Sequence, residues 1–175
     1  MTWLNDLITR IFAFFPRLIM IAPDEAGVRV TLGTRVKVLE SGWYFVWPLI
    51  QEVTAMIVTP QVVDLRGQSI MEPDGKSLAV SGAIEYRISR IEKAILSVQD
   101  LDRSLQNLAL GIIADIVSSK DVSLVEFKDE LLKRLRDRVS DWGVKIIQVY
   151  ITDYADHAVY RVINDGNGYN MVLPK

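Results

Sequence analysis

The spacing of apolar residues changes from two to about 3.6 near residue 90, and this change most restricts the fold. Between Leu78 and Ile88, larger apolar side chains alternate with small or charged ones, which is the pattern of a half-buried strand. From Asp102 to Ser118, leucine and isoleucine recur at intervals of three and four residues, as on an amphipathic helix. A β-rich half followed by a helical half predicts an α+β fold.

Several segments before residue 73 are also predicted to be strands. They are rich in β-branched and aromatic residues and are bounded by turn-forming residues: 28–32, 43–48, 53–58 and 61–70. Gly67 marks an expected bulge in the last of them. Pro73-Asp74-Gly75 is a strong turn signal, so the strands on either side are expected to pair. The first lobe is therefore expected to be a mostly antiparallel sheet.

The helical half carries clear end signals. A short helix is expected over 91–98, before the longer one at 102–118. Ser123 and Glu126 form a capping-box pattern that begins a further helix. Gly143 is placed to end that helix in the left-handed conformation. The following segment, 144–152, is apolar on both faces, which predicts a final, buried strand.

The first 22 residues are unusually apolar but do not have the length of a membrane span. Their longest charge-free stretch, 11–16, is far shorter than the roughly 20 residues that cross a bilayer. With helical spacing, most of the large side chains fall on one side, while Arg10 and Arg17 can reach lipid headgroups. Pro16 would bend or break such a helix.

We therefore expect an amphipathic segment lying in the membrane interface. The alternative is an N-terminal helix packed on the protein's own core. The side chains expected to contact the membrane are Trp3, Leu4, Leu7, Ile8, Ile11, Phe12, Phe14, Phe15, Leu18 and Ile19.

Composition argues against several classes of function. Twenty basic and 22 acidic residues give a formal charge of −2, so no overall charge favours nucleic acid. Cysteine is absent, which excludes disulfides, zinc–thiolate sites and a cysteine nucleophile. His157 is the only histidine, so neither a histidine-based triad nor a two-histidine metal site can form. We expect no catalytic residue, no metal, no cofactor and no enzymatic activity.

A charged stripe on the helix after Ser123 has two interpretations. Charged side chains there are usually a solvated helix face, but mixed charge can also contact a neighbouring protomer. The candidate interface residues are Lys128, Lys133, Arg134, Arg136, Asp137, Arg138 and Asp141.

Short motifs along residues 22–153 resemble one family in the family's own order. They are Ile21-Ala-Pro-Asp-Glu-Ala-Gly-Val28, Leu32-Gly33, Gly42-Trp-Tyr-Phe45 with Pro48, Gln61-Val-Val-Asp64, Gln68-Ser-Ile70, Asp74-Gly75, Tyr86-Arg-Ile88, and Asp141-Trp-Gly-Val-Lys-Ile146 with Val149 and Ile151-Thr-Asp153. This order resembles the SPFH or Band 7 domain of the stomatin, prohibitin, flotillin and HflK/C group. No single motif is specific, but their shared order is hard to produce by chance.

The resemblance implies a membrane-anchored scaffold that self-assembles laterally into rings or cages and organises a membrane patch. Its implied partners are membrane lipid, further copies or longer family members, and a membrane protease or channel. The alternative is a non-assembling adaptor or regulator of a membrane protease or another membrane partner. Arg10 and Arg17 favour the cytoplasmic face of the inner or plasma membrane.

The resemblance also suggests how the chain is divided. We expect a membrane-associating segment (1–22), a β-rich first subdomain (23–90), an α/β second subdomain (91–153) and a tail with a possible hairpin (154–175). Family members normally continue into a long coiled coil, whereas no heptads follow Asp153 here. Assembly is therefore expected to use the globular domains alone, or the chain is a reduced member.

Overall fold

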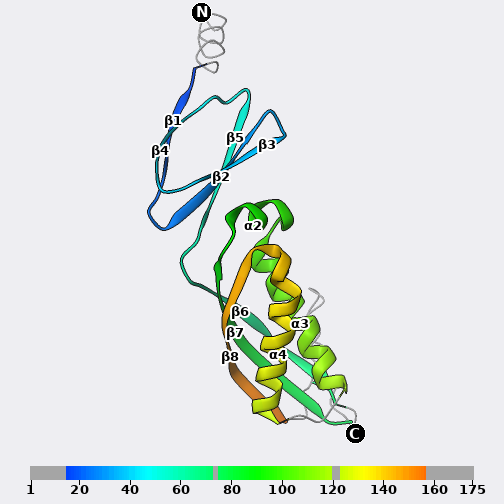
Figure 1. Cartoon of the computed structure of the whole chain (residues 1–175). Helices are drawn as coiled ribbons and strands as arrows, with labels where there is room; N and C mark the ends of the chain where they lie inside the picture. Colours follow the sequence, from blue (N-terminus) through cyan, green and yellow to red (C-terminus); the bar gives the residue numbers. More distant parts are fainter. Residues whose placement is uncertain (1–14, 73–74, 120–122, 157–175) are drawn as a thin grey trace, which may run out of the picture.

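The computed structural model describes residues 15–72, 75–119 and 123–156, which form two lobes joined end to end (Figure 1). The first lobe contains β1 (Arg17–Ile21), β2 (Glu25–Thr31), β3 (Arg35–Leu39), β4 (Gly42–Val46) and β5 (Gln51–Ile57). The second lobe contains β6 (Gln61–Met71), β7 (Ser77–Ile88), α2 (Ile91–Ser97), α3 (Leu101–Ser119), α4 (Leu124–Val139), the 3₁₀ turn η1 (Ser140–Trp142) and β8 (Val144–Asp156).

Two small antiparallel sheets build the described part of the first lobe. One has the order β1-β4 and the other β3-β2-β5. They meet at Gly27, where an added Cβ would lie 2.8 Å from Cδ1 of Ile21. Ile21, Leu39 and Val46 are buried at this contact. Val28 points to the opposite side of β2 and joins the main core, so the first lobe rests on the second through β2 and α2.

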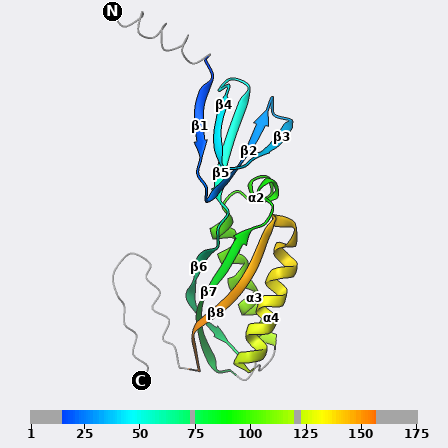
Figure 2. The ribbon, with the colours of Figure 1, turned by 60° about the vertical axis from the view of Figure 1, so that its left-hand side comes forward.

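The second lobe is a sheet of order β6-β7-β8 with α3 and α4 on one face (Figures 1 and 2). The expected alternation in β7 is confirmed, because Leu78, Val80, Ile84, Tyr86 and Ile88 are all buried against the helices. The predicted hairpin of β6 and β7 and the bulge near Gly67 are also present. The change from strand-like to helical spacing near residue 90 falls inside this lobe and not between the lobes, because β7 pairs with both β6 and β8.

The helix-end signals are confirmed. Ser123 accepts a hydrogen bond from the backbone N–H of Glu126, whose carboxylate accepts one from the N–H of Ser123. Gly143 has a φ of 73°. An added Cβ there would lie 2.4 Å from the carbonyl oxygen of Arg90, which itself accepts from the N–H of Ala94. Glycine is thus required at this position both by φ and by the close approach of α2.

The expected helical spacing is wrong at Leu18 and Ile19. Both residues lie in β1, so they point to opposite sides: Leu18 is exposed and Ile19 is half-buried. The strand arises because Pro16 ends any preceding helix and because β4 offers a partner for five residues. The domain boundaries drawn from the sequence stay predictions, and β1 lies inside the segment 1–22.

The burial expected for the last strand is only partly correct. Ile146 and Val149 are buried, but Ile147 and Ile151 are half-buried because β8 is an edge of its sheet. Two register shifts against β7 re-aim its side chains. The predicted membrane contacts from Trp3 to Phe14, together with His157 and the tail hairpin, lie outside the described residues.

Candidate membrane-contact surface

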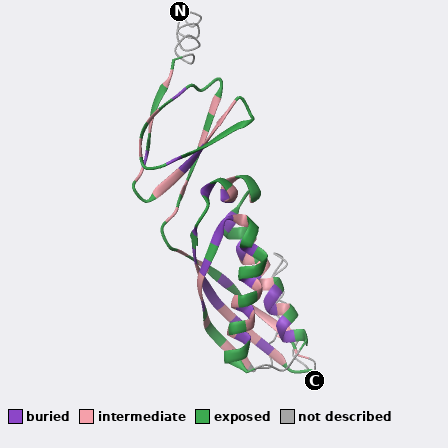
Figure 3. Cartoon of the chain, in the orientation of Figure 1, coloured by how far each residue is buried: buried purple, intermediate pink, exposed green. Residues whose placement is uncertain are grey.

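Four large apolar side chains share the outer face of the β1-β4 sheet. Leu18 lies opposite Phe45, and Met20 lies opposite Trp43. They are 53%, 67%, 60% and 66% exposed, respectively. The alternate residues of both strands point inward, and Ile21 and Val46 are buried there. In Figure 3 the exposed positions lie on strands that no described helix covers.

More exposed apolar side chains lie at the free end of the first lobe. The start of β1, the β2–β3 turn and the β4–β5 connection all lie at the end away from the second lobe (Figure 2). They carry exposed Phe15, Leu32, Trp47, Leu49 and Ile50. The N–H of Leu32 donates to the carbonyl oxygen of Ile50 at 2.8 Å, which joins the turn to the connection.

Leu32 is unusual because its φ is 51°, a left-handed conformation that bulky residues rarely adopt. A leucine in this conformation at an exposed turn gains nothing from the protein's own core. We call these nine side chains (Phe15, Leu18, Met20, Leu32, Trp43, Phe45, Trp47, Leu49 and Ile50) the apolar end. An exposed group of this size is characteristic of a contact with a membrane or another protein.

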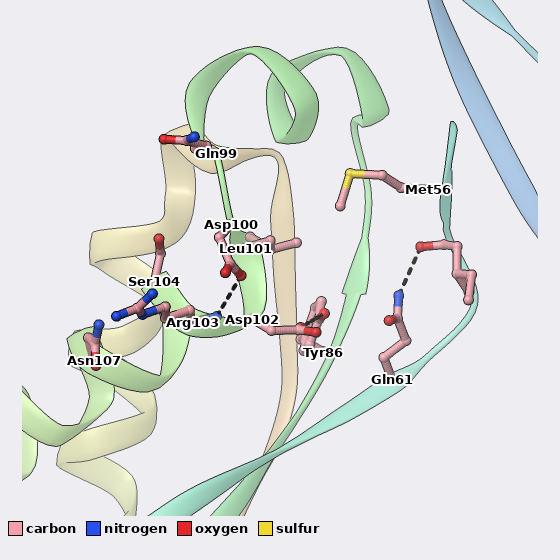
Figure 4. A pocket seen from close by; sticks show the side chains of 11 residues that line it. Met56, Gln61, Tyr86, Gln99, Asp100, Leu101, Asp102, Arg103, Ser104 and Asn107 are labelled. Carbon is pink, nitrogen blue, oxygen red and sulfur yellow. Dashed lines mark hydrogen bonds between the residues drawn. The ribbon is translucent and has the colours of Figure 1, made fainter. Parts of the chain in front are cut away.

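A second candidate is a cleft of about 840 Å³ between the lobes (Figure 4). It is lined by the end of β5, the start of β6, Tyr86 of β7 and the first turns of α3. Several of its polar groups already have partners. Gln61 donates to the carbonyl oxygen of Ile57 at 2.9 Å, and Asp100 accepts from the N–H of Arg103 at 3.1 Å, capping α3.

The buried Tyr86 hydroxyl donates to the carboxylate of Asp102 in this cleft. Burial and this carboxylate raise the pKa of Tyr86 well above its ordinary value of 10.0. The tyrosine is thus held neutral and serves as a donor rather than as a base. The cleft walls contain no histidine or lysine, and no group of three potential metal-ligating side chains occurs in the described residues. The apolar end is the candidate surface with the larger exposed apolar group.

The sequence model of the SPFH domain / Band 7 family matches residues 19–167. The chain belongs to the SPFH domain / Band 7 family. An uncharacterized protein of Methanocaldococcus jannaschii is 26% identical over 86% of this chain and 78% of its own length. A putative Band 7 family protein of Acanthamoeba polyphaga mimivirus is 22% identical over 76% of this chain and 46% of its own length. Mouse stomatin is 22% identical over 64% of this chain and 41% of its own length.

This Band 7 chain thus spans less than half the length of two of these three relatives. None of the helices in its described residues is long and apolar enough to span a bilayer.

The candidate interface residues, which lie on α4 and η1, divide into two groups. Three have partners within the chain: Arg134 pairs with Glu130 at 2.7 Å, Asp141 lies 3.8 Å from Lys93, and Arg136 binds β8. Lys133, Asp137 and Arg138 are exposed, and Lys128 is half-buried. The side chains of these four residues make no hydrogen bond or ion pair with other described residues.

The membrane-contact set predicted from the sequence includes Phe15 and Leu18 but not the other seven members of the apolar end. The sequence signal for Trp43 and Phe45 was their alternation with Tyr44 and Val46 in a predicted strand. That signal identifies a strand with two apolar faces, but not which face the protein covers. The pairing of β1 with β4 supplies the missing information.

Proposed function

We propose that this Band 7 protein is a peripheral membrane scaffold whose first lobe contacts the bilayer through the apolar end. The single observation that carries the proposal is the exposed cross-strand set Leu18, Met20, Trp43 and Phe45. Aromatic side chains favour the membrane interface, and each large apolar side chain that leaves water contributes about 1.5–3 kcal/mol. The amphipathic sequence pattern of residues 3–14 is the second membrane contact that we propose.

Vesicle flotation tests the proposal. The full chain is compared with Trp43→Ser/Phe45→Ser, and with Val62→Ser/Met71→Ser as the matched control on exposed positions of β6. We expect the first pair to lower partitioning into phosphatidylcholine vesicles more than tenfold, and the control to leave it unchanged. Equal flotation of both variants would mean that the apolar end does not contact lipid.

Truncation separates the two contacts. Deleting residues 2–14 removes most of the amphipathic segment and leaves β1, which the β1-β4 sheet requires. We expect this variant to bind vesicles more weakly and to lose its remaining binding when Trp43 and Phe45 are also replaced. Full binding by the combined variant would refute both contacts.

We further propose that copies associate laterally, using the free charged side chains Lys133, Asp137 and Arg138 of α4. Light scattering in detergent tests this step with the reversed-charge variant Lys133→Glu/Arg138→Glu. We expect large assemblies for the natural chain and smaller ones for the variant. A stable monomer of the natural chain at high concentration would instead favour the non-assembling adaptor. The cytoplasmic face and the protease or channel partner stay predictions.

A further inference from the structure

The first lobe also carries a group of cations with no counter-charge. Arg29 lies directly opposite Lys37 across the β2-β3 pair, and Arg35 lies two residues beyond Lys37, opposite Thr31. Alternation along a strand puts these three side chains on the same side of the sheet as Gly27. Because Gly27 faces Ile21 of β1, this is the side turned toward the β1-β4 sheet.

Arg17 adds a fourth cation to the same opening. It begins β1, opposite Val46, and lies on the same inward side of the strand as Ile19 and Ile21. We call Arg17, Arg29, Arg35 and Lys37 the cationic mouth. Arg17, Arg29 and Arg35 lie in the half of their strands nearest the free end of the lobe, and Lys37 lies at the middle of β3. The free end also carries five members of the apolar end: Phe15, Leu32, Trp47, Leu49 and Ile50 (Figures 1 and 2).

The mouth lacks acidic residues. The described acidic residues of this lobe are Asp24, Glu25, Glu40 and Glu52. The first three lie at the other end of the strands, and Glu52 pairs with Val30 on the opposite face of the sheet. No side chain of the cationic mouth has a hydrogen-bond or ion-pair partner among the described residues, and Nε of Arg29 is buried without one.

This arrangement costs stability in the isolated chain. Like charges directly opposite each other destabilise a strand pair, and a buried donor without an acceptor loses its water without compensation. A phosphate oxygen would satisfy both, because arginine and lysine donate charge-assisted hydrogen bonds to phosphate. A bilayer that contacts Phe15, Leu32, Trp47, Leu49 and Ile50 at the free end brings its headgroups close to these cations.

We propose that the cationic mouth binds the phosphate of an anionic lipid headgroup. The inference rests on the membrane contact proposed above, and it adds a preference for negatively charged lipid. The occupant is a membrane lipid rather than a free anion because the exposed apolar side chains adjoin the mouth on the same end of the lobe.

The test compares binding to vesicles of phosphatidylcholine alone with binding to vesicles that also contain phosphatidylglycerol. The variant is Arg29→Gln/Arg35→Gln/Lys37→Gln in the full chain. The control is Arg66→Gln/Arg87→Gln/Lys145→Gln, which removes the same charge from the second lobe, including a directly opposed pair, Arg87 and Lys145. We expect the natural chain to prefer anionic vesicles, with a preference that falls as salt rises.

Each cation near an anionic surface contributes roughly fivefold to binding, so the triple variant should lose on the order of a hundredfold on anionic vesicles. Its binding to neutral vesicles should not change, and the control should keep the preference. If the triple variant does not fold, the exposed pair Arg35→Gln/Lys37→Gln should lose roughly 25-fold.

Three outcomes overturn the inference. They are a triple variant that keeps the preference, a control that loses it equally, and full competition by millimolar inorganic phosphate, which would mark a site for free anions. Failure of the natural chain to bind neutral vesicles would instead count against the proposed membrane contact itself. The two failures are therefore distinguishable.

Discussion

The two lobes use the same alternating strand pattern with opposite results. In the second lobe, the apolar face of β7 is covered by α3 and α4, and Ile84 and Tyr86 are almost fully buried. In the first lobe, no described helix covers the β1-β4 sheet, and Trp43 and Phe45 are about two-thirds exposed. A strand pattern thus specifies an apolar face, while the elements that follow decide whether the protein itself covers it.

The largest expected effect is a difference in stability loss between two phenylalanine truncations, one in each lobe. Phe127 is fully buried and packs against Tyr154 with ring centroids 5.4 Å apart, so Phe127→Ala should lower the free energy of unfolding by about 3–5 kcal/mol. The exposed Phe45→Ala should change it by about 0.5 kcal/mol or less. Urea unfolding of both variants checks the contrast. Similar losses would show that Phe45 is covered in solution.

The pH dependence of stability compares a buried tyrosine of the second lobe, Tyr86, with a tyrosine of the first lobe. The pKa of Tyr86 is raised in the folded chain, whereas in the unfolded chain it stays near 10.0. The folded chain therefore holds one more proton than the unfolded chain above pH 10. The contribution of Tyr86 to stability is complete below that pH and falls by about 1.4 kcal/mol per pH unit above it.

The measurement is urea unfolding between pH 8 and 11. Tyr86→Phe should be less stable than the natural chain at pH 8, because Asp102 loses its donor, and should lose less stability as the pH rises. Parallel curves for the two proteins would contradict the role of this hydrogen bond. The half-buried Tyr44 of the first lobe donates to the carbonyl oxygen of Glu40 rather than to a carboxylate, so Tyr44→Phe provides the control tyrosine change.

The smallest expected effect is a gain on the outer face of α3. Gly111 is exposed within the helix, and an added Cβ would meet no atom within 4 Å. Gly111→Ala should therefore raise the free energy of unfolding by about 0.5–1 kcal/mol. Thermal unfolding of the detergent-solubilised chain checks the gain. A variant that is stabilised but no longer assembles would identify this face as a contact between copies.

Much of the second lobe could be predicted because its signals are local. The capping box at Ser123, the turn before β7 and the left-handed Gly143 each depend on a few neighbouring residues. The sequence around Leu18 and Ile19 fits helical spacing, and the strand that they pair with, β4, lies more than twenty residues away. Pairing between distant segments decides their structure, and one sequence does not report it.

The candidate site was predictable only in part for the same reason. An apolar N-terminal region pointed to a membrane, but the inclusion of Trp43 and Phe45 depends on their register with Met20 and Leu18. The opposition of Arg29 and Lys37 likewise depends on the register set by the turn at Leu32 and Gly33. Shifting β3 by one residue against β2 would send Lys37 to the other face of the sheet, away from Arg29.

One contact of α4 has a consequence for how copies can meet. Arg136 donates from Nε to the carbonyl oxygen of Ile146 at 3.3 Å and from Nη2 to that of Ile147 at 3.2 Å. These oxygens belong to β8, a long outer strand of the kind that recruits foreign strands into fibres. With both acceptors occupied, these two carbonyl groups are less available to a foreign strand. This part of the edge strand is thereby protected from strand addition and the irreversible aggregation that follows from it.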